Sequence, residues 1–298
     1  MKKCVPPVFK AEKPCVVLRN DKGDGLKRRW VRFMYKNDLV ERYAQDAEDR
    51  LVLARVLDKM DEAARKNIIV STHFLNENQC ALAELMIRAQ RNPPHLFYGG
   101  YDGALRKVVM FFPDYLEPAP PADETLNPLA VLRCTYSKAH TPSHRDFLGA
   151  LMGCGVKRET IGDILAGEGS CDIVVLKEVL PYLTANLESA GKTRLTNMAI
   201  PMDQIQVPKA GFKLVKDTIA SLRLDNVVSA GFSTSREKAS DAVKAGKVFL
   251  NHMICIKADK PVHEGDIVSV RGMGKFELLQ VGAPTKKGRL PVVIKRFV

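Results

Sequence analysis

Apolar residues in the first third of the chain recur at helical spacing. Between residues 38 and 60, apolar and small residues fall near one face, which predicts an amphipathic helix. Asn76 is a predicted N-cap for a second helix over residues 77–90, which ends before Pro93. Residues 68–70 form a short apolar run, and residues 95–103 predict a turn that enters a strand over 107–112. We therefore expect a helical N-terminal domain over residues 34–104.

The pattern changes in the middle of the chain. Strand-like and helix-like runs alternate in the order β-α-β-β-α-β, over residues 129–136, 143–153, 161–165, 171–175, 176–189 and 193–200. This is the order of ferredoxin-like folds, which many RNA-recognition (RRM-like) domains share. We expect such a domain over residues 105–218. Base stacking on an RRM sheet needs aromatic side chains, and residues 171–175 offer none, so a scaffold or a protein-contact surface is favoured.

The last third predicts two short helices and a small twisted hairpin. Thr234 and Glu237 have the spacing of a capping box, and small apolar residues then recur at helical spacing as far as Gly246. Residues 248–250 and 254–256 predict strands on either side of an Asn251-His252 turn. A further turn at residues 265–266 precedes a strand over 267–270.

The charge of the chain is concentrated at its two ends. The total is +12, yet residues 220–298 hold 14 Lys or Arg against 7 Asp or Glu, and residues 1–33 hold 10 against 3. The remainder holds 22 against 24. Localised cations release counterions from phosphates, which favours nucleic-acid binding at the basic ends. Arg236, Lys244 and Lys247 have the spacing of one helical face, which would present three of these cations together.

The composition argues against several other classes of protein. The apolar runs are too short for a membrane span. The seven cysteines contain no C-x-x-C pair, and the six histidines form no metal-like cluster, so we expect no metal or other cofactor and a reducing, cytoplasmic setting. Residues 1–33 lack the apolar core of a signal peptide. We expect them either to be a disordered basic extension or to be absent from the protein, because the start of translation was assigned too early.

Residues 223–272 resemble the S-four-type (alpha-L) RNA-binding domain, because an RLD opening, an SREKA helix start, a KAGKVFLN strand entry and a GDIV turn follow in order. The segments HTPSHRDFLGALMGCGVKRETIGDIL at 140–165, SLRLD at 221–225 and VRGMGKFEL at 270–278 extend the likeness. Together they resemble the YlmH family of bacterial proteins over roughly residues 34–298. The resemblance implies an α+β chain with a helical N-terminal part, an RRM-like middle and an S-four-type domain over 219–298.

The same resemblance implies a function and a set of contact residues. It implies a non-catalytic RNA-binding protein that associates with ribosomal RNA of the large ribosomal subunit, with or without peptidyl-tRNA, in ribosome-associated quality control. Arg223 and Arg236 would be the strongest phosphate contacts. The remaining predicted RNA-binding residues are Lys238, Lys244, Lys247, Ser235 and Asn251.

Two alternatives remain open from the residues. Asp225 is interpreted as a structural carboxylate that pairs with a nearby arginine, but an Arg-Leu-Asp segment also resembles the catalytic loop of pseudouridine synthases. Only 73 residues follow Asp225 in the chain, which leaves little room for a catalytic domain. The second alternative is a protein-interaction adaptor that uses the ferredoxin-like sheet. Binding that survives nuclease treatment would favour the adaptor.

Overall fold

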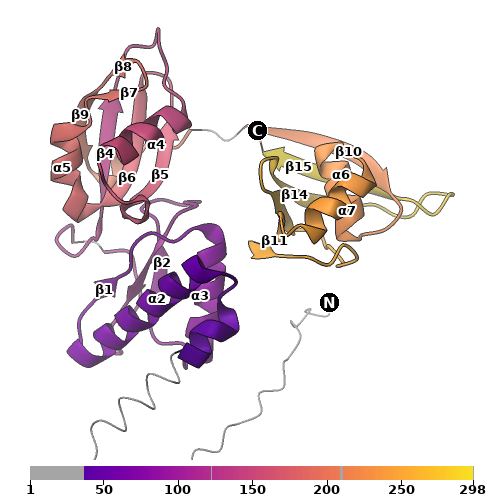
Figure 1. Ribbon diagram of the computed structural model, residues 1–298, viewed down its shortest axis with the longest axis horizontal. Helices are drawn as coiled ribbons and strands as arrows, with labels where there is room; N and C mark the ends of the chain where they lie inside the picture. The colour runs from indigo at the N-terminus through magenta and orange to yellow at the C-terminus, as the bar shows by residue number, and fades with distance from the viewer. Residues whose placement is uncertain (1–36, 122, 209–210, 298) are drawn as a thin grey trace, which may run out of the picture.

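The computed structural model describes residues 37–121, 123–208 and 211–297, and mixes helices with strands throughout (Figure 1). The expectation for residues 1–33 therefore lies outside the described residues. The N-terminal part comprises a helical segment at residues 37–43 followed by α2 (Ala47–Lys66), β1 (Val70–Ser71), α3 (Glu77–Ala89), β2 (His95–Tyr98) and β3 (Val108–Phe111).

Two predictions about the N-terminal part are wrong. The helix expected over residues 38–60 is interrupted, because Asp46 has an extended backbone and its side chain accepts a hydrogen bond from the Asp49 N–H. Helix α2 starts after this cap and continues to Lys66, where Asn67 takes a left-handed conformation. The turn expected at residues 95–103 begins with a strand, β2, which pairs with β3. This part is thus not purely helical, since its sheet has the order β1-β3-β2.

The strand β3 is buried on both faces. Val109 and Phe111 pack against α2 and α3, whereas Val108 and Met110 pack in a second cluster with residues of the middle sheet. A strand that is covered on both faces needs apolar side chains at every position, which explains the continuous apolar sequence VVMF. Residues 105–112 therefore belong to the packing of the N-terminal sheet.

The middle part forms a four-stranded antiparallel sheet of order β5-β6-β4-β9. Its elements are β4 (Leu129–Thr135), α4 (His144–Gly153), a 3-10 turn η1 (Arg158–Thr160), β5 (Ile161–Ala166), β6 (Ser170–Leu176), η2 (Lys177–Val179), α5 (Leu180–Asn186), β7 (Ser189–Ala190), β8 (Thr193–Arg194), β9 (Thr196–Ile200) and η3 (Met202–Gln204). The helix expected over 176–189 is shorter, because a 3-10 turn precedes Pro181 and the chain leaves the helix after Asn186. The strand expected over 193–200 is split between β8 and β9.

The two faces of the middle sheet are both covered. On one face Leu132 and Ile173 pack with Phe147 of α4 and Leu183 of α5. On the other face Leu129, Val174 and Leu176 pack with the N-terminal strand β3, and Met202 and Ile205 pack against the same cluster. The face on which RRM domains stack bases is therefore occupied by the chain's own N-terminal sheet.

The C-terminal part is built on a six-stranded sheet of order β10-β15-β14-β13-β11-β12, with two helices across one side (Figure 1). Its elements are β10 (Phe212–Ile219), α6 (Leu224–Phe232), α7 (Arg236–Lys244), β11 (Val248–Leu250), β12 (Met253–Ile254), β13 (Ile267–Val270), β14 (Gly274–Val281) and β15 (Leu290–Phe297). The predicted hairpin is thus only one end of a larger sheet. Strand β10 pairs along its whole length with β15, although it begins seven residues before the predicted boundary at 219.

Local predictions in this part are partly correct. The cap of α7 is Ser235, whose hydroxyl accepts from the Lys238 N–H, and not Thr234. Thr234 remains in the turn between the helices, where its N–H donates to Ser229 O. The turn at Asn251 and His252 is present with positive φ at both residues, as a two-residue hairpin of type I′ requires. The following strand, β12, covers residues 253–254 instead of 254–256.

Candidate nucleic-acid interface

Arg223 and Arg236 are brought together by one buried carboxylate. Asp225 lies in the first turn of α6, and its side chain is 4 % exposed. Arg223, at the N-cap of α6, donates Nε to Asp225 Oδ1 at 3.2 Å and Nη2 to Oδ2 at 3.3 Å. Arg236, the first residue of α7, donates Nε to Asp225 Oδ2 at 3.1 Å. We call these three residues the Asp225 cluster.

The arginines of the Asp225 cluster are paired but remain accessible. Their side chains are 42 % and 56 % exposed, and each guanidinium has five N–H groups of which Asp225 uses one or two. Two cations against one anion leave the cluster with a formal charge of +1. A planar guanidinium held by a carboxylate is oriented before it meets a phosphate, which favours bidentate recognition.

The charge state of Asp225 follows from these contacts. Burial raises the pKa of this carboxyl, but hydrogen bonds from Arg223 and Arg236 and their charges outweigh burial, so the pKa lies below its ordinary value of 3.8. Asp225 is therefore ionised at neutral pH. The interpretation of Asp225 as a carboxylate that pairs with a nearby arginine is confirmed.

This shift predicts a pH dependence of stability. A carboxyl whose pKa is lower in the folded state stabilises the fold above its ordinary pKa, and the contribution is lost as pH falls through the folded value. We expect Asp225→Asn to lower the free energy of unfolding by about 1–3 kcal/mol at neutral pH, with the difference from wild type shrinking below about pH 4. Urea unfolding of both proteins between neutral and acidic pH measures it. A difference that stays constant to the lowest pH would contradict the assignment.

The predicted lysines are distributed unevenly around the Asp225 cluster. Lys244 lies eight residues after Arg236, about 80° around the helix, and so faces a similar direction. Lys238 lies two residues after Arg236, about 200° around, and points elsewhere. Lys247 follows the end of α7 and the left-handed Gly246, so the predicted row of three helical cations is wrong. All three lysines are exposed.

Two predicted contact residues have structural roles. The Ser235 hydroxyl caps α7, as described above. The Asn251 side chain donates to Asp266 Oδ1 at 2.8 Å and accepts from the Ile267 N–H at 2.9 Å, which ties the hairpin turn to β13. One of its two amide N–H groups and one lone pair of its oxygen are thereby used within the fold. His252, the other turn residue, faces Glu77 of α3 at 3.6 Å.

Two lysines near the Asp225 cluster were missed by sequence reasoning. The Leu224 N–H donates to Lys260 O and the Asp225 N–H to Ala258 O, so the loop over residues 257–261 lies against the start of α6. Lys257 and Lys260 in this loop are exposed. The available signal was the segment KADKP, whose two lysines precede a proline. The candidate interface thus gains two cations that lie more than 30 residues after Arg223 and more than 20 after Arg236 in the chain.

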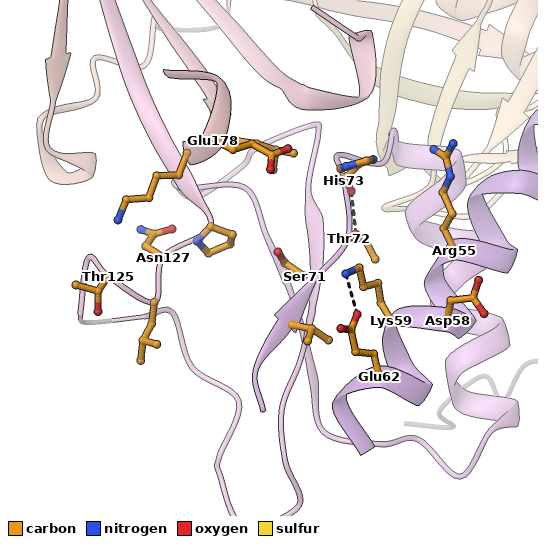
Figure 2. A pocket seen from close by; sticks show the side chains of 15 residues that line it. Arg55, Asp58, Lys59, Glu62, Ser71, Thr72, His73, Thr125, Asn127 and Glu178 are labelled. Atoms are coloured by element: carbon orange, nitrogen blue, oxygen red, sulfur yellow. Dashed lines mark hydrogen bonds and ion pairs between the residues drawn. The ribbon is translucent and has the colours of Figure 1, made fainter. Parts of the chain in front are cut away.

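A second candidate, a cleft between the N-terminal and middle parts, is less suited to phosphates. It has a volume of about 740 Å³ and lies between α2, the β1 strand and the loop over 125–128 (Figure 2). Two of its cations have acidic partners: Lys59 binds Glu62 at 2.9 Å, and Arg55 binds Glu159 at 2.6 Å. A third, Lys177, donates to the backbone Glu124 O at 2.6 Å. The cleft therefore has no excess of positive charge at these positions.

Comparison with known proteins places the Asp225 cluster inside a matched domain. The family model described as a putative RNA-binding domain in YlmH matches residues 127–204, and the model of the S4 domain matches residues 222–268, which include the Asp225 cluster. The ribosome-associated protein quality control protein P2 of Bacillus subtilis (strain 168) is 32 % identical over 226 residues, which cover 76 % of this chain and 86 % of that protein. The chain belongs to the YlmH family.

A solved relative is more distant. The cell division protein ylmH from Streptococcus pneumoniae is similar at 18 % identity with a TM-score of 0.45, over 55 % of this chain and 98 % of that chain. In this member of the YlmH family, the described residues contain no helix long and apolar enough to cross a membrane. Within the same residues, no group of three or more His, Cys, Asp or Glu is placed to hold a metal ion.

Proposed function

We propose that this protein is a non-catalytic RNA-binding protein that associates with ribosomal RNA of the large ribosomal subunit, with or without peptidyl-tRNA, in ribosome-associated quality control in the cytoplasm. The Asp225 cluster is the observation that carries the proposal, because it presents two oriented guanidinium groups inside the matched S4 domain. The printed name of the Bacillus subtilis relative supports the ribosomal setting. Phosphate contacts of this kind position a protein on RNA, and the shape of the RNA supplies selectivity.

The fold supports a division of the chain into three units with different roles. We infer an N-terminal α+β unit, a ferredoxin-like (RRM-like) middle unit and an S-four-type C-terminal unit. The pairing of β3 with β1 and β2 supports a first boundary after residue 112, and the pairing of β10 with β15 supports a second boundary before residue 212. The middle sheet acts as a scaffold for the N-terminal sheet, since these two sheets cover each other.

The geometry disfavours the two alternatives. A pseudouridine synthase needs a carboxylate that reaches a nucleobase, but Asp225 is buried and both of its oxygens are bound by guanidinium groups. An adaptor that used the open face of the middle sheet would need that face to be free, and residues of the N-terminal sheet cover it. No residue is therefore assigned a catalytic role, and the proposed function needs no cofactor.

Co-sedimentation of the full-length protein with large subunits from cell extract tests the proposal. We expect binding that is lost after nuclease treatment and that weakens steeply with salt. Four phosphate contacts would give about a 100-fold loss of affinity between about 50 and 200 mM salt. Binding that survives nuclease, or a flat salt dependence, would identify a protein contact instead and would refute the proposal. Sedimentation with small subunits is the matched control.

A further inference from the structure

The outer face of the C-terminal sheet carries an aromatic pair that the S4 match does not include. Helices α6 and α7 cover one face of this sheet, and Val292 and Ile294 of β15 belong to the core beneath them. Because side chains alternate along a strand, Lys295 lies on the opposite face from Ile294, and Phe297 follows on that same face; both are partly exposed. Phe212 is the register partner of Phe297 across β10 and β15, and both strands lie outside residues 222–268.

The geometry of this pair is suited to a nucleotide. Phe212 is 54 % exposed. The Lys295 ammonium lies 5.2 Å from the centroid of the Phe212 ring and 5.2 Å from that of the Phe297 ring, which is within cation–π distance of both. Two aromatic rings beside a shared cation offer stacking for bases and a counter-charge for a phosphate, which is the combination that single-stranded nucleic-acid sites use.

The charge around the aromatic pair is strongly positive. Strand β10 and the β14–β15 hairpin, residues 212–219 and 274–297, contain eight Lys or Arg and two Asp or Glu. Of these, Lys213, Asp217 and Arg296 alternate onto the helical face, so six cations and one acid remain. The remaining acid, Glu277, already lies 4.0 Å from Lys295. An apolar protein partner would have to desolvate these cations, whereas a polyanion binds to them. The charge therefore favours RNA over a protein as the occupant.

Only part of the outer face of the C-terminal sheet is open, because the N-terminal part lies against the rest. Lys275 of β14 lies 5.6 Å from the Phe297 ring and binds Glu77 of α3 at 3.2 Å. Beyond Lys275, strands β11 to β13 approach the N-terminal part, where Phe249 and Arg271 share a pocket with Asp49. The open portion of the face is thus the β10–β15 side, with Phe212 at the sheet edge.

We propose that Phe212, Lys295 and Phe297 form a second RNA contact that stacks bases of a single-stranded segment. It is separate from the Asp225 cluster, which lies on the helical side and holds phosphates. The inference extends the proposed function, because it adds recognition of unpaired bases to recognition of a folded RNA.

Binding of a fluorescent single-stranded RNA of about 12 nucleotides to the full-length protein tests the inference. We expect Phe212→Ala to weaken binding about tenfold, Phe212→Leu to weaken it nearly as much, and Phe212→Trp to retain it. Leu214→Ala is the matched control, since Leu214 lies on the same face of the same strand and is also 54 % exposed. Leu214→Ala should change RNA affinity by less than about twofold, because no aromatic ring is lost.

Base stacking can be distinguished from phosphate binding and from a protein contact. An abasic oligonucleotide of the same length should bind the wild-type protein at least as weakly as the normal oligonucleotide binds Phe212→Ala, because it loses stacking on both rings. Equal binding of abasic and normal RNA by the wild-type protein would overturn the inference. Unchanged RNA affinity in Phe212→Ala, with loss of a co-purifying protein, would make the surface a protein contact and would also overturn it. Because the assay uses no ribosomes, its result is independent of the co-sedimentation test.

Discussion

Replacing both Arg223 and Arg236 by alanine, in a chain that also carries Asp225→Asn, is expected to weaken binding to large-subunit RNA by about 100-fold or more. Each hydrogen-bonded charge contact contributes about 1.5–3 kcal/mol, and the two guanidinium groups are the oriented cations of the interface. The slope of log affinity against log salt should also fall by about two, one for each lost phosphate contact. Sedimentation and filter binding at several salt concentrations measure both effects.

The third substitution is needed because of the buried carboxylate. Removing only the arginines would leave Asp225, which is 3 % exposed, with a charge that nothing neutralises. An unpaired buried charge destabilises a fold by several kcal/mol, so a loss of binding would be confused with unfolding. Asp225→Asn removes that charge. The variant Asp225→Asn alone then reports the effect of the carboxylate with both arginines present.

Arg50 provides a matched control for the arginine substitutions. Its side chain is 55 % exposed and pairs with Glu41 at 3.1 Å, so it resembles Arg236 in exposure and in pairing but lies on α2. Arg50→Ala should leave RNA affinity within about twofold, since one distant exposed charge contributes little. Equal losses from Arg50→Ala and from the cluster variant would mean that overall charge, and not the Asp225 cluster, governs binding.

Local features of the chain were largely predictable from the sequence. The strand expected at residues 129–136 is β4, Leu129–Thr135, and the helix expected at 143–153 is α4, His144–Gly153, with Ser143 as its cap. These elements have clear alternation or clear caps. The wrong predictions occur where two local signals compete. Thr234 and Ser235 can both cap a helix, and the requirements of the preceding turn select Ser235.

Long-range features were not predictable from local patterns. Strand β10 pairs with β15 across more than 70 residues, and nothing in the segment FKLVKDTI specifies that partner. For the same reason sequence spacing did not bring Lys260 next to Arg223. It did suggest that Asp225 pairs with a nearby arginine, because Arg223 is only two residues away; the participation of Arg236 requires the packing of α6 against α7.

Asp163 is the most consequential residue that sequence reasoning missed. It lies on β5 and is 9 % exposed, and it accepts hydrogen bonds from the Tyr101 hydroxyl at 2.8 Å, the Leu105 N–H at 2.7 Å and the Arg106 N–H at 3.1 Å. One carboxylate of the middle sheet thereby holds the loop that joins β2 to β3. It fixes the N-terminal sheet over the middle sheet.

Asp163→Ala is therefore expected to lower the free energy of unfolding of these two packed sheets by about 3 kcal/mol or more, because three part-buried hydrogen bonds lose their acceptor and each loss costs about 1–3 kcal/mol. Asp146→Ala is the control. The Asp146 side chain also accepts bonds at a loop-to-helix junction, from the Ser143 N–H and hydroxyl, but it is exposed, so the loss should be about 1 kcal/mol. Urea unfolding of each variant gives the comparison. Equal losses would show that Asp163 does not join the two sheets.

Asp163→Ala also tests whether the packing of the N-terminal and middle sheets affects RNA binding by the C-terminal part. The Asp225 cluster is supported by a different core, formed by α6, α7 and the six-stranded sheet. At urea concentrations below the unfolding midpoint of Asp163→Ala, RNA affinity at the Asp225 cluster should therefore stay within about twofold of wild type. This is expected for independent sites that share no partners. A large loss of affinity in the folded variant would show that the N-terminal and middle sheets contribute contacts to the RNA.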